Sequence, residues 1–140
     1  MFRGLIILGL IFCNLIKVQE QEEPYIPTVE EYLSPTEWEE QAQLMHITCY
    51  YSSANAHTYS GQIVHEGGCA SNKENLGKIA CVYTKDKKVV GFYECNDIGG
   101  NYQLKNGTAI DIWQPDLNSC WGFIHKYGDE LYVIWIDAEG

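Results

Sequence analysis

From Ile47 onward, apolar and polar residues alternate in short segments that are rich in β-branched and aromatic side chains. Turn residues separate these segments, and short strands at fairly even spacing predict an all-β domain. Because no long helical pattern lies between them, a parallel α/β sheet is not expected. The expected strands are residues 47–51, 61–65, 78–83, 89–95, 101–104, 108–113, 121–125 and 130–136.

Residues 19–45 follow a different pattern, with many glutamates and no lysine or arginine. Capping boxes at residues 28–31 and 34–37 place a hydroxyl residue three positions before a glutamate. The second box predicts a short helix over residues 35–45, which would cover a sheet edge or a barrel end. An acidic propeptide or a partner-binding arm is the alternative interpretation. The apolar stripe of this helix would consist of Trp38, Ala42 and Met45.

Residues 1–18 have the features of a secretory signal peptide. A positive start containing Arg3 precedes an apolar run over residues 5–16, which is too short to span a membrane. Cleavage is expected near Val18. The sequence therefore predicts a secreted, extracellular protein, in which the acidic arm of residues 19–45 precedes a β domain at 46–140.

The overall charge limits the class of partner. Nine lysines and arginines stand against 19 aspartates and glutamates, which gives a formal net charge of −10 at pH 7. Arg3 is the only arginine and lies in the predicted signal peptide. This composition argues against binding to nucleic acid or to anionic membranes, both of which need clustered positive charge. A basic protein, a surface component or calcium fits an acidic surface better.

The cysteines beyond the signal peptide are odd in number. In a small secreted domain they predict disulfides, and no CxxC pair points to zinc or redox chemistry. One thiol is left free or pairs with a second chain, which would give a dimer. Since four cysteines allow three connectivities, about 15 arrangements remain open. The disulfide candidates are Cys49, Cys69, Cys81, Cys95 and Cys120.

One stretch suggests the fold class. Residues 92–104 predict a strand, a corner at Gly99 and Gly100, and a second strand, and a looser copy lies at residues 46–61. The stretch resembles the Greek-key signature of the βγ-crystallin superfamily, in which an aromatic residue opens the motif and a glycine closes the hairpin. This resemblance implies a mainly β protein: an antiparallel Greek-key β-sandwich of two related motifs, with a short N-terminal helix. A bulky residue at Gly100 should then unfold the domain.

The same resemblance implies a calcium site. Many members of that superfamily bind calcium through a loop of acidic and hydroxyl residues, and residues 115–120 occupy the matching positions here. Asp116, Ser119 and Glu94 are the implied ligands of one weak site, although Pro115 and Cys120 depart from the family pattern. Calcium generally requires several hard oxygen ligands.

The segment 106–108 carries two signals at once. Asn106-Gly107-Thr108 is an N-glycosylation sequon, with Asn106 as the acceptor, and its first two residues predict a two-residue hairpin turn.

No catalytic motif stands out. His65 lacks a second ligand or base at diagnostic spacing, which favours an exposed residue at a strand end. No nucleophile elbow, P-loop or paired-carboxylate motif is visible. The lack of arginine beyond the predicted signal peptide argues against phosphoryl transfer. The large aromatic residues are predicted to form the core: Tyr83, Phe92, Tyr93, Trp113, Trp121, Phe123 and Trp135.

Taken together, these patterns predict a secreted, non-enzymatic binding module that acts on an extracellular protein or surface component, with calcium as the only implied cofactor. One alternative is a small secreted hydrolase whose catalytic residues are dispersed along the chain. A disulfide-stabilised toxin or effector is another.

Overall fold

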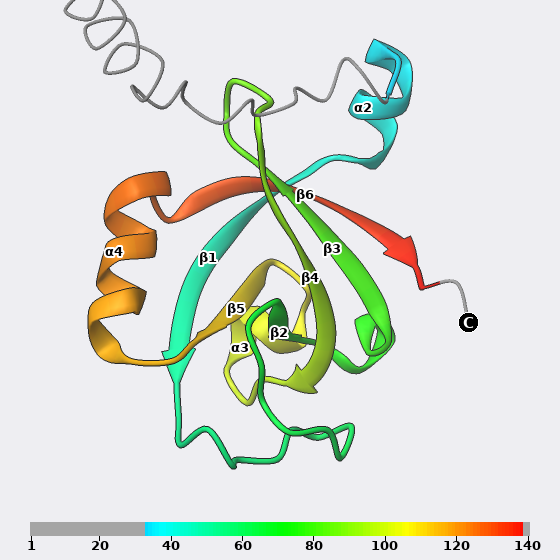
Figure 1. The fold of residues 1–140 in the computed structure, drawn as a ribbon. Helices are drawn as coiled ribbons and strands as arrows, with labels where there is room; N and C mark the ends of the chain where they lie inside the picture. Colours follow the sequence, from blue (N-terminus) through cyan, green and yellow to red (C-terminus); the bar gives the residue numbers. More distant parts are fainter. Residues whose placement is uncertain (1–32, 139–140) are drawn as a thin grey trace, which may run out of the picture.

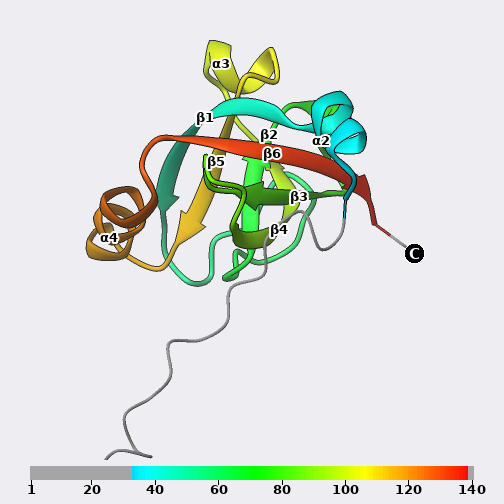
Figure 2. The same ribbon diagram turned by 90° about the horizontal axis from the view of Figure 1, so that it is seen from above.

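Six strands close into a single mixed β-barrel, shown from two directions in Figures 1 and 2. This computed structural model describes residues 33–138. The order of the strands around the barrel is β1-β5-β2-β4-β3-β6. The elements are α2 (Pro35–Gln41), β1 (Gln43–Tyr51), β2 (Gly68–Ser71), the 3-10 helix η2 (Lys73–Asn75), β3 (Lys78–Tyr83), β4 (Val89–Ile98), α3 (Tyr102–Lys105), β5 (Ala109–Gln114), α4 (Leu117–Tyr127) and β6 (Glu130–Asp137).

The barrel corrects the predicted antiparallel Greek-key sandwich of two motifs. β1 pairs in parallel with β5, and β2 pairs in parallel with β4, whereas the other ladders are antiparallel. Among the described strands, only β3 and β4 are both consecutive and paired. The prediction failed because alternation shows which residues face a core but not which strand lies alongside.

The pairing divides the barrel into two interlocked halves. If β1, β2 and β3 form the first half and β4, β5 and β6 the second, every ladder among these strands joins one half to the other. β1 contacts β5 and β6, β2 contacts β4 and β5, and β3 contacts β4 and β6. Neither half therefore contains a sheet of its own.

Two helices replace predicted strands. Residues 102–105 form α3, and residues 117–127 form α4, where strands were expected at 101–104 and 121–125. The missed signal in α4 is a helical stripe, in which residues separated by three or four positions face the barrel. Asp116 caps the start of this helix, and Gly128 ends it with a φ of 85°. The stripe consists of Cys120, Phe123, Ile124 and Tyr127.

The N-terminal helix is shorter than predicted. The capping box is confirmed, because the Glu37 amide donates to Ser34 Oγ at 3.3 Å and the Ser34 amide donates to Glu37 Oε2 at 2.8 Å. However, α2 ends at Gln41, and β1 begins at Gln43, inside the predicted arm. The expected strand at 61–65 is also absent, with one isolated bridge joining His57 to Ile63. The signal peptide and the capping box at 28–31 lie outside the described residues.

The barrel interior is filled by aliphatic side chains. Inward-facing residues such as Ile47, Ile110 and Val133 are at most 1% exposed. A smaller cluster lies outside the barrel, where Trp38 of α2 packs edge-to-face on Tyr83 and Tyr132. Figures 1 and 2 both place α4 beside β1 and far from α2.

Not all of the predicted core aromatics are buried. Tyr83 and Trp113 are buried as expected, but Phe92 and Trp121 are 58% and 67% exposed. Trp121 misses the core because it lies on a helix face that points away from the apolar stripe. In residues 33–138, no helix has the length and apolar character needed to cross a membrane.

We expect Gly99→Ala to destabilise the barrel strongly and Gly100→Ala to be tolerated. A Cβ at Gly99 would lie 2.0 Å from Leu104 Cδ1 and 2.7 Å from Leu104 Cβ, whereas a Cβ at Gly100 meets nothing within 4 Å. Leu104 is buried, so overpacking should cost about 1–3 kcal/mol of unfolding free energy. Urea unfolding of the two variants checks this, and equal midpoints would contradict it. The tight corner glycine is therefore Gly99 and not the predicted Gly100.

Because every described ladder crosses between the halves, neither half should fold alone. A chain divided in the turn between β3 and β4 would yield two fragments without a paired sheet. We expect each fragment to show no cooperative thermal transition by circular dichroism. A sharp transition in either isolated fragment would contradict this expectation.

Candidate functional site

A row of side chains crosses four neighbouring strands on the outer face of the barrel. Thr48 of β1 pairs with Asp111 of β5, which pairs with Ala70 of β2, and Ala70 in turn pairs with Asp97 of β4. Ile110 and Ile112 are fully buried in the core, so strand alternation turns Asp111 outward. Two carboxylates from the second half of the chain thus lie on either side of a buried alanine.

A β-bulge gives Asp97 its place in this row. Cys69 pairs with Cys95, but Ala70 pairs with Asp97, so Asn96 is an extra residue in β4. Cys95 faces the core, and simple alternation would return Asp97 to the core as well. The bulge reverses the alternation and brings Asp97 beside Ala70. Bulges that redirect a side chain are common next to functional sites.

Asp111 is half-buried and accepts a hydrogen bond from the neighbouring strand β1. Its Oδ1 accepts a 2.8 Å hydrogen bond from Thr48 Oγ1. Burial raises the pKa of the Asp111 carboxyl, and the nearby negative charge of Asp97 raises it further, although the Thr48 hydrogen bond opposes both effects. The protonated form of Asp111 therefore persists to a higher pH than that of an ordinary aspartate.

Asp97 is held by three hydrogen-bond donors. The Tyr50 hydroxyl donates to Oδ2 at 3.2 Å, and the amides of Tyr59 and Ile98 donate to Oδ1 at 3.0 and 2.9 Å. Both oxygens of the Asp97 carboxylate therefore have hydrogen-bond partners. Burial raises the pKa of the Tyr50 hydroxyl, as do Asp97 and, more weakly, Asp111, so Tyr50 remains a donor. We call Thr48, Tyr50, Asp97 and Asp111 the carboxylate site.

Exposed aromatic side chains flank the carboxylate site. Tyr59, whose amide binds Asp97, is 60% exposed. On the other side, Thr48 also lines a mainly apolar hollow of about 320 Å³ between β1 and α4. Leu117 and Trp121 of α4 line the same hollow and are 48% and 67% exposed. Aromatic faces beside paired carboxylates suit a ligand with both apolar faces and hydroxyl groups.

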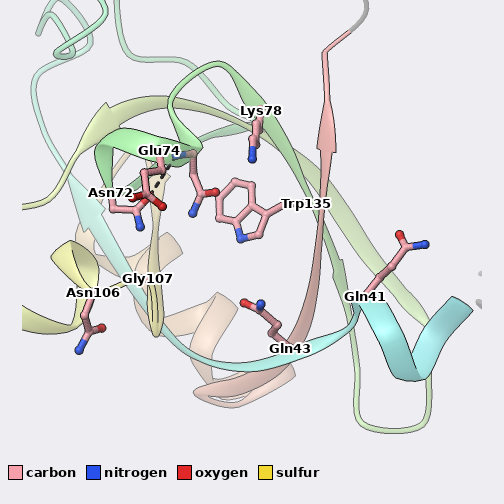
Figure 3. Close-up of a pocket in the computed structure, with 9 residues that line it drawn as sticks. Gln41, Gln43, Asn72, Glu74, Lys78, Asn106, Gly107 and Trp135 are labelled. Carbon is pink, nitrogen blue, oxygen red and sulfur yellow. Dashed lines mark hydrogen bonds between the residues drawn. The ribbon is translucent and has the colours of Figure 1, made fainter.

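A second hollow, of about 410 Å³, lies at one end of the barrel and is shown in Figure 3. We call it the barrel mouth. The indole of Trp135 projects into it, with Lys78 and Gln43 on neighbouring strands. Its polar groups could bind a small hydroxylated ligand through several hydrogen bonds. The remaining lining residues are Gln41, Asn72, Glu74, Asn75, Asn106 and Gly107.

The structure gives the predicted calcium ligands other roles. Asp116 caps α4, and its Oδ1 accepts from the Ser119 amide at 2.7 Å, a contact that lowers the pKa of Asp116. Glu94 lies on β4, where Gln62 Nε2 donates to it at 3.0 Å and His65 Nε2 lies 3.7 Å from it. Among residues 33–138, no three His, Cys, Asp or Glu side chains gather as a metal site. Calcium binding stays a prediction.

The glycosylation acceptor is exposed. Asn106 follows α3 rather than forming the predicted hairpin turn between two strands, and its Oδ1 accepts from the Thr108 hydroxyl at 2.6 Å. Glycosylation of Asn106 stays a prediction. The predicted exposure of His65 is confirmed.

The carboxylate site could not be predicted from the sequence because its members lie far apart in the chain. Thr48 and Asp111 are neighbours only through a parallel ladder, and the bulge at Asn96 has no simple sequence signature. One local signal existed: Asp111 lies between two isoleucines of a strand, a position where aspartate is disfavoured. That signal marks an outward carboxylate but does not identify its partner.

Comparisons with protein-family models, with curated proteins and with solved structures found no match.

We expect Asp111→Asn and Asp97→Asn to change stability in opposite directions at pH 7. Asparagine at 111 keeps an acceptor for Thr48 and removes a charge that is unfavourable in this site. Asparagine at 97 has one acceptor oxygen for donors that now occupy two, and should lose about 1–3 kcal/mol. Urea unfolding measures both changes.

The pH dependence gives a further check on Asp111. Because its pKa is raised in the folded state, the folded protein binds the proton more tightly than the unfolded chain does. The parent protein therefore loses stability as pH rises from the ordinary aspartate range through the folded pKa. The advantage of Asp111→Asn should be largest at pH 7 and disappear below about pH 4. An advantage that does not vary with pH would contradict a raised pKa.

Proposed function

We propose that the protein is a secreted hydrolase that cleaves glycosidic bonds in a neutral polysaccharide. The observation that carries the proposal is the carboxylate site, where two aspartates on one face have contrasting environments. Burial raises the pKa of the Asp111 carboxyl, whereas Asp97 accepts hydrogen bonds from three donors. A carboxyl group with a raised pKa near a second carboxyl in a different environment is characteristic of acid–base catalysis.

The two aspartates take complementary roles in this reaction. Asp111 donates its proton to the glycosidic oxygen as the bond to the anomeric carbon breaks. Asp97 removes a proton from a water molecule, whose oxygen attacks the anomeric carbon. Tyr50 and Thr48 hold the two carboxylates in position through their hydroxyl groups.

The strand spacing sets the distance between the backbones of the two aspartates. They lie on opposite sides of β2, two strand spacings apart, so their backbones are separated by about 9–10 Å. The stereochemical outcome depends on the distance between the carboxyl groups themselves, which is about 6.5–9.5 Å in inverting enzymes and shorter in retaining ones.

The substrate class follows from charge and from the flanking aromatics. A net charge of −10 disfavours acidic polymers. Tyr59, whose backbone amide binds Asp97, has an exposed ring that offers a stacking surface for a pyranose, and Trp121 offers another in the hollow that Thr48 lines. A neutral glucan or chitin oligosaccharide combines apolar sugar faces with hydroxyl groups and suits this arrangement.

We expect Asp111→Asn and Asp97→Asn each to lower kcat by at least about 100-fold on the cleaved polysaccharide. Tyr59→Ala should mainly raise KM, and Tyr102→Ala is its matched control because Tyr102 is 81% exposed on α3, outside the carboxylate site. The assay measures reducing ends released from soluble β-glucan, chitin oligosaccharides and, for comparison, polygalacturonate. If the parent protein cleaves none of them, or both asparagine variants retain full activity, the proposal is wrong.

A binding module without catalysis is the second candidate, and the barrel mouth favours it. Trp135 and the surrounding amides would bind a sugar unit there through stacking and hydrogen bonds. In that case Glu74→Gln and Lys78→Met would weaken oligosaccharide binding in calorimetry, while Asp111→Asn would leave it unchanged. Binding without any release of reducing ends would favour this second function.

A further inference from the structure

Two pairs of cysteines meet in the fold. Cys69 and Cys95 are directly opposed across the parallel ladder of β2 and β4, and both are fully buried in the barrel core. Neighbouring strands lie about 4.8 Å apart, which is within the range of Cα separations that a disulfide spans. The neighbouring Cys95 thiol and burial together raise the pKa of the Cys69 thiol.

The second pair joins β1 to α4. Cys49 lies between the two site residues of β1, and Cys120 lies on the face of α4 that packs against the barrel. Both line the hollow between these elements. Burial raises the pKa of Cys49 to about 12, with a smaller contribution from Cys120.

Cys81 lies apart from both pairs. It belongs to the outer cluster with Trp38, Tyr83 and Ile134, beneath α2, and is 4% exposed. Burial alone raises the pKa of its thiol, without a contribution from another cysteine. Its position on β3 gives it no opposed cysteine, since its ladder partners are Phe92 and Ile134.

We propose that the protein carries two disulfides, Cys69–Cys95 and Cys49–Cys120, and that Cys81 remains a buried free thiol. The structure records these five cysteines as thiols, and each crosslink forms one S–S bond from two of them. Each crosslink releases two protons and passes two electrons to an oxidant. In a secretory compartment, this oxidant is the disulfide of a thiol–disulfide oxidoreductase. This assignment selects one of the arrangements that the sequence left open.

Both crosslinks would lie next to the carboxylate site. Cys95 is two residues before Asp97, and its bond to Cys69 would fix the register on one side of the bulge. Cys49 lies between Thr48 and Tyr50, so its bond to Cys120 would hold α4 against the strand that positions both carboxylates. The inference concerns covalent structure and holds whether or not the site is catalytic.

The test is a thiol map of protein secreted from an oxidising expression host. Because buried thiols resist labelling in the folded state, the protein is first denatured in guanidinium with N-ethylmaleimide and no reductant. Digestion and mass spectrometry then identify labelled and linked peptides. We expect a label on Cys81 alone, together with linked peptides containing Cys69–Cys95 and Cys49–Cys120.

Two cysteine-to-serine variants test the assignment of each disulfide separately. Cys81→Ser is the matched control and should leave both linked peptides unchanged, whereas Cys49→Ser should release Cys120 for labelling without affecting Cys69–Cys95. A non-reducing gel of the parent protein should show a monomer. Labels on all five cysteines, a linked peptide that contains Cys81, or a disulfide-bonded dimer would each overturn the proposal.

Discussion

Every described β-ladder joins a strand from the first half of the chain to one from the second, and the rest of the structure depends on this constraint. β2 is the critical element, because its four residues are all buried and it pairs with both β4 and β5. Without it the barrel would open between those two strands. A strand so short has little stability of its own, so its formation depends on partners that lie later in the sequence.

The carboxylate site is a product of the same interlocking. Thr48 comes from the first half, whereas Asp97 and Asp111 come from the second, and Ala70 separates the two carboxylates. The bulge at Asn96 completes the site, since it turns Asp97 to the outer face while Cys95 stays in the core. The site therefore forms only when β1, β5, β2 and β4 have paired.

The sequence predicted what local patterns determine, including the capping box at Ser34 and β3 at residues 78–83. It predicted a strand where α4 lies, because a stripe of aromatic and aliphatic residues in a short segment suits a strand as well as a helix. The carboxylate site could not be predicted from the sequence for a different reason. Asp97 and Asp111 become neighbours through ladders to β2, and no local pattern encodes such pairings.

The filled interior explains why the carboxylate site lies on the outside of this barrel. Six strands enclose a space that aliphatic side chains such as Ile47 and Ile112 already occupy, which leaves the outer face and the ends for ligands. An outer carboxylate would ordinarily be well solvated and ionise as a free aspartate does. Here the neighbouring strands bury Asp111 enough to raise its pKa, while three donors surround Asp97. Strand pairing thus supplies both the position of the two carboxylates and the contrast between their surroundings.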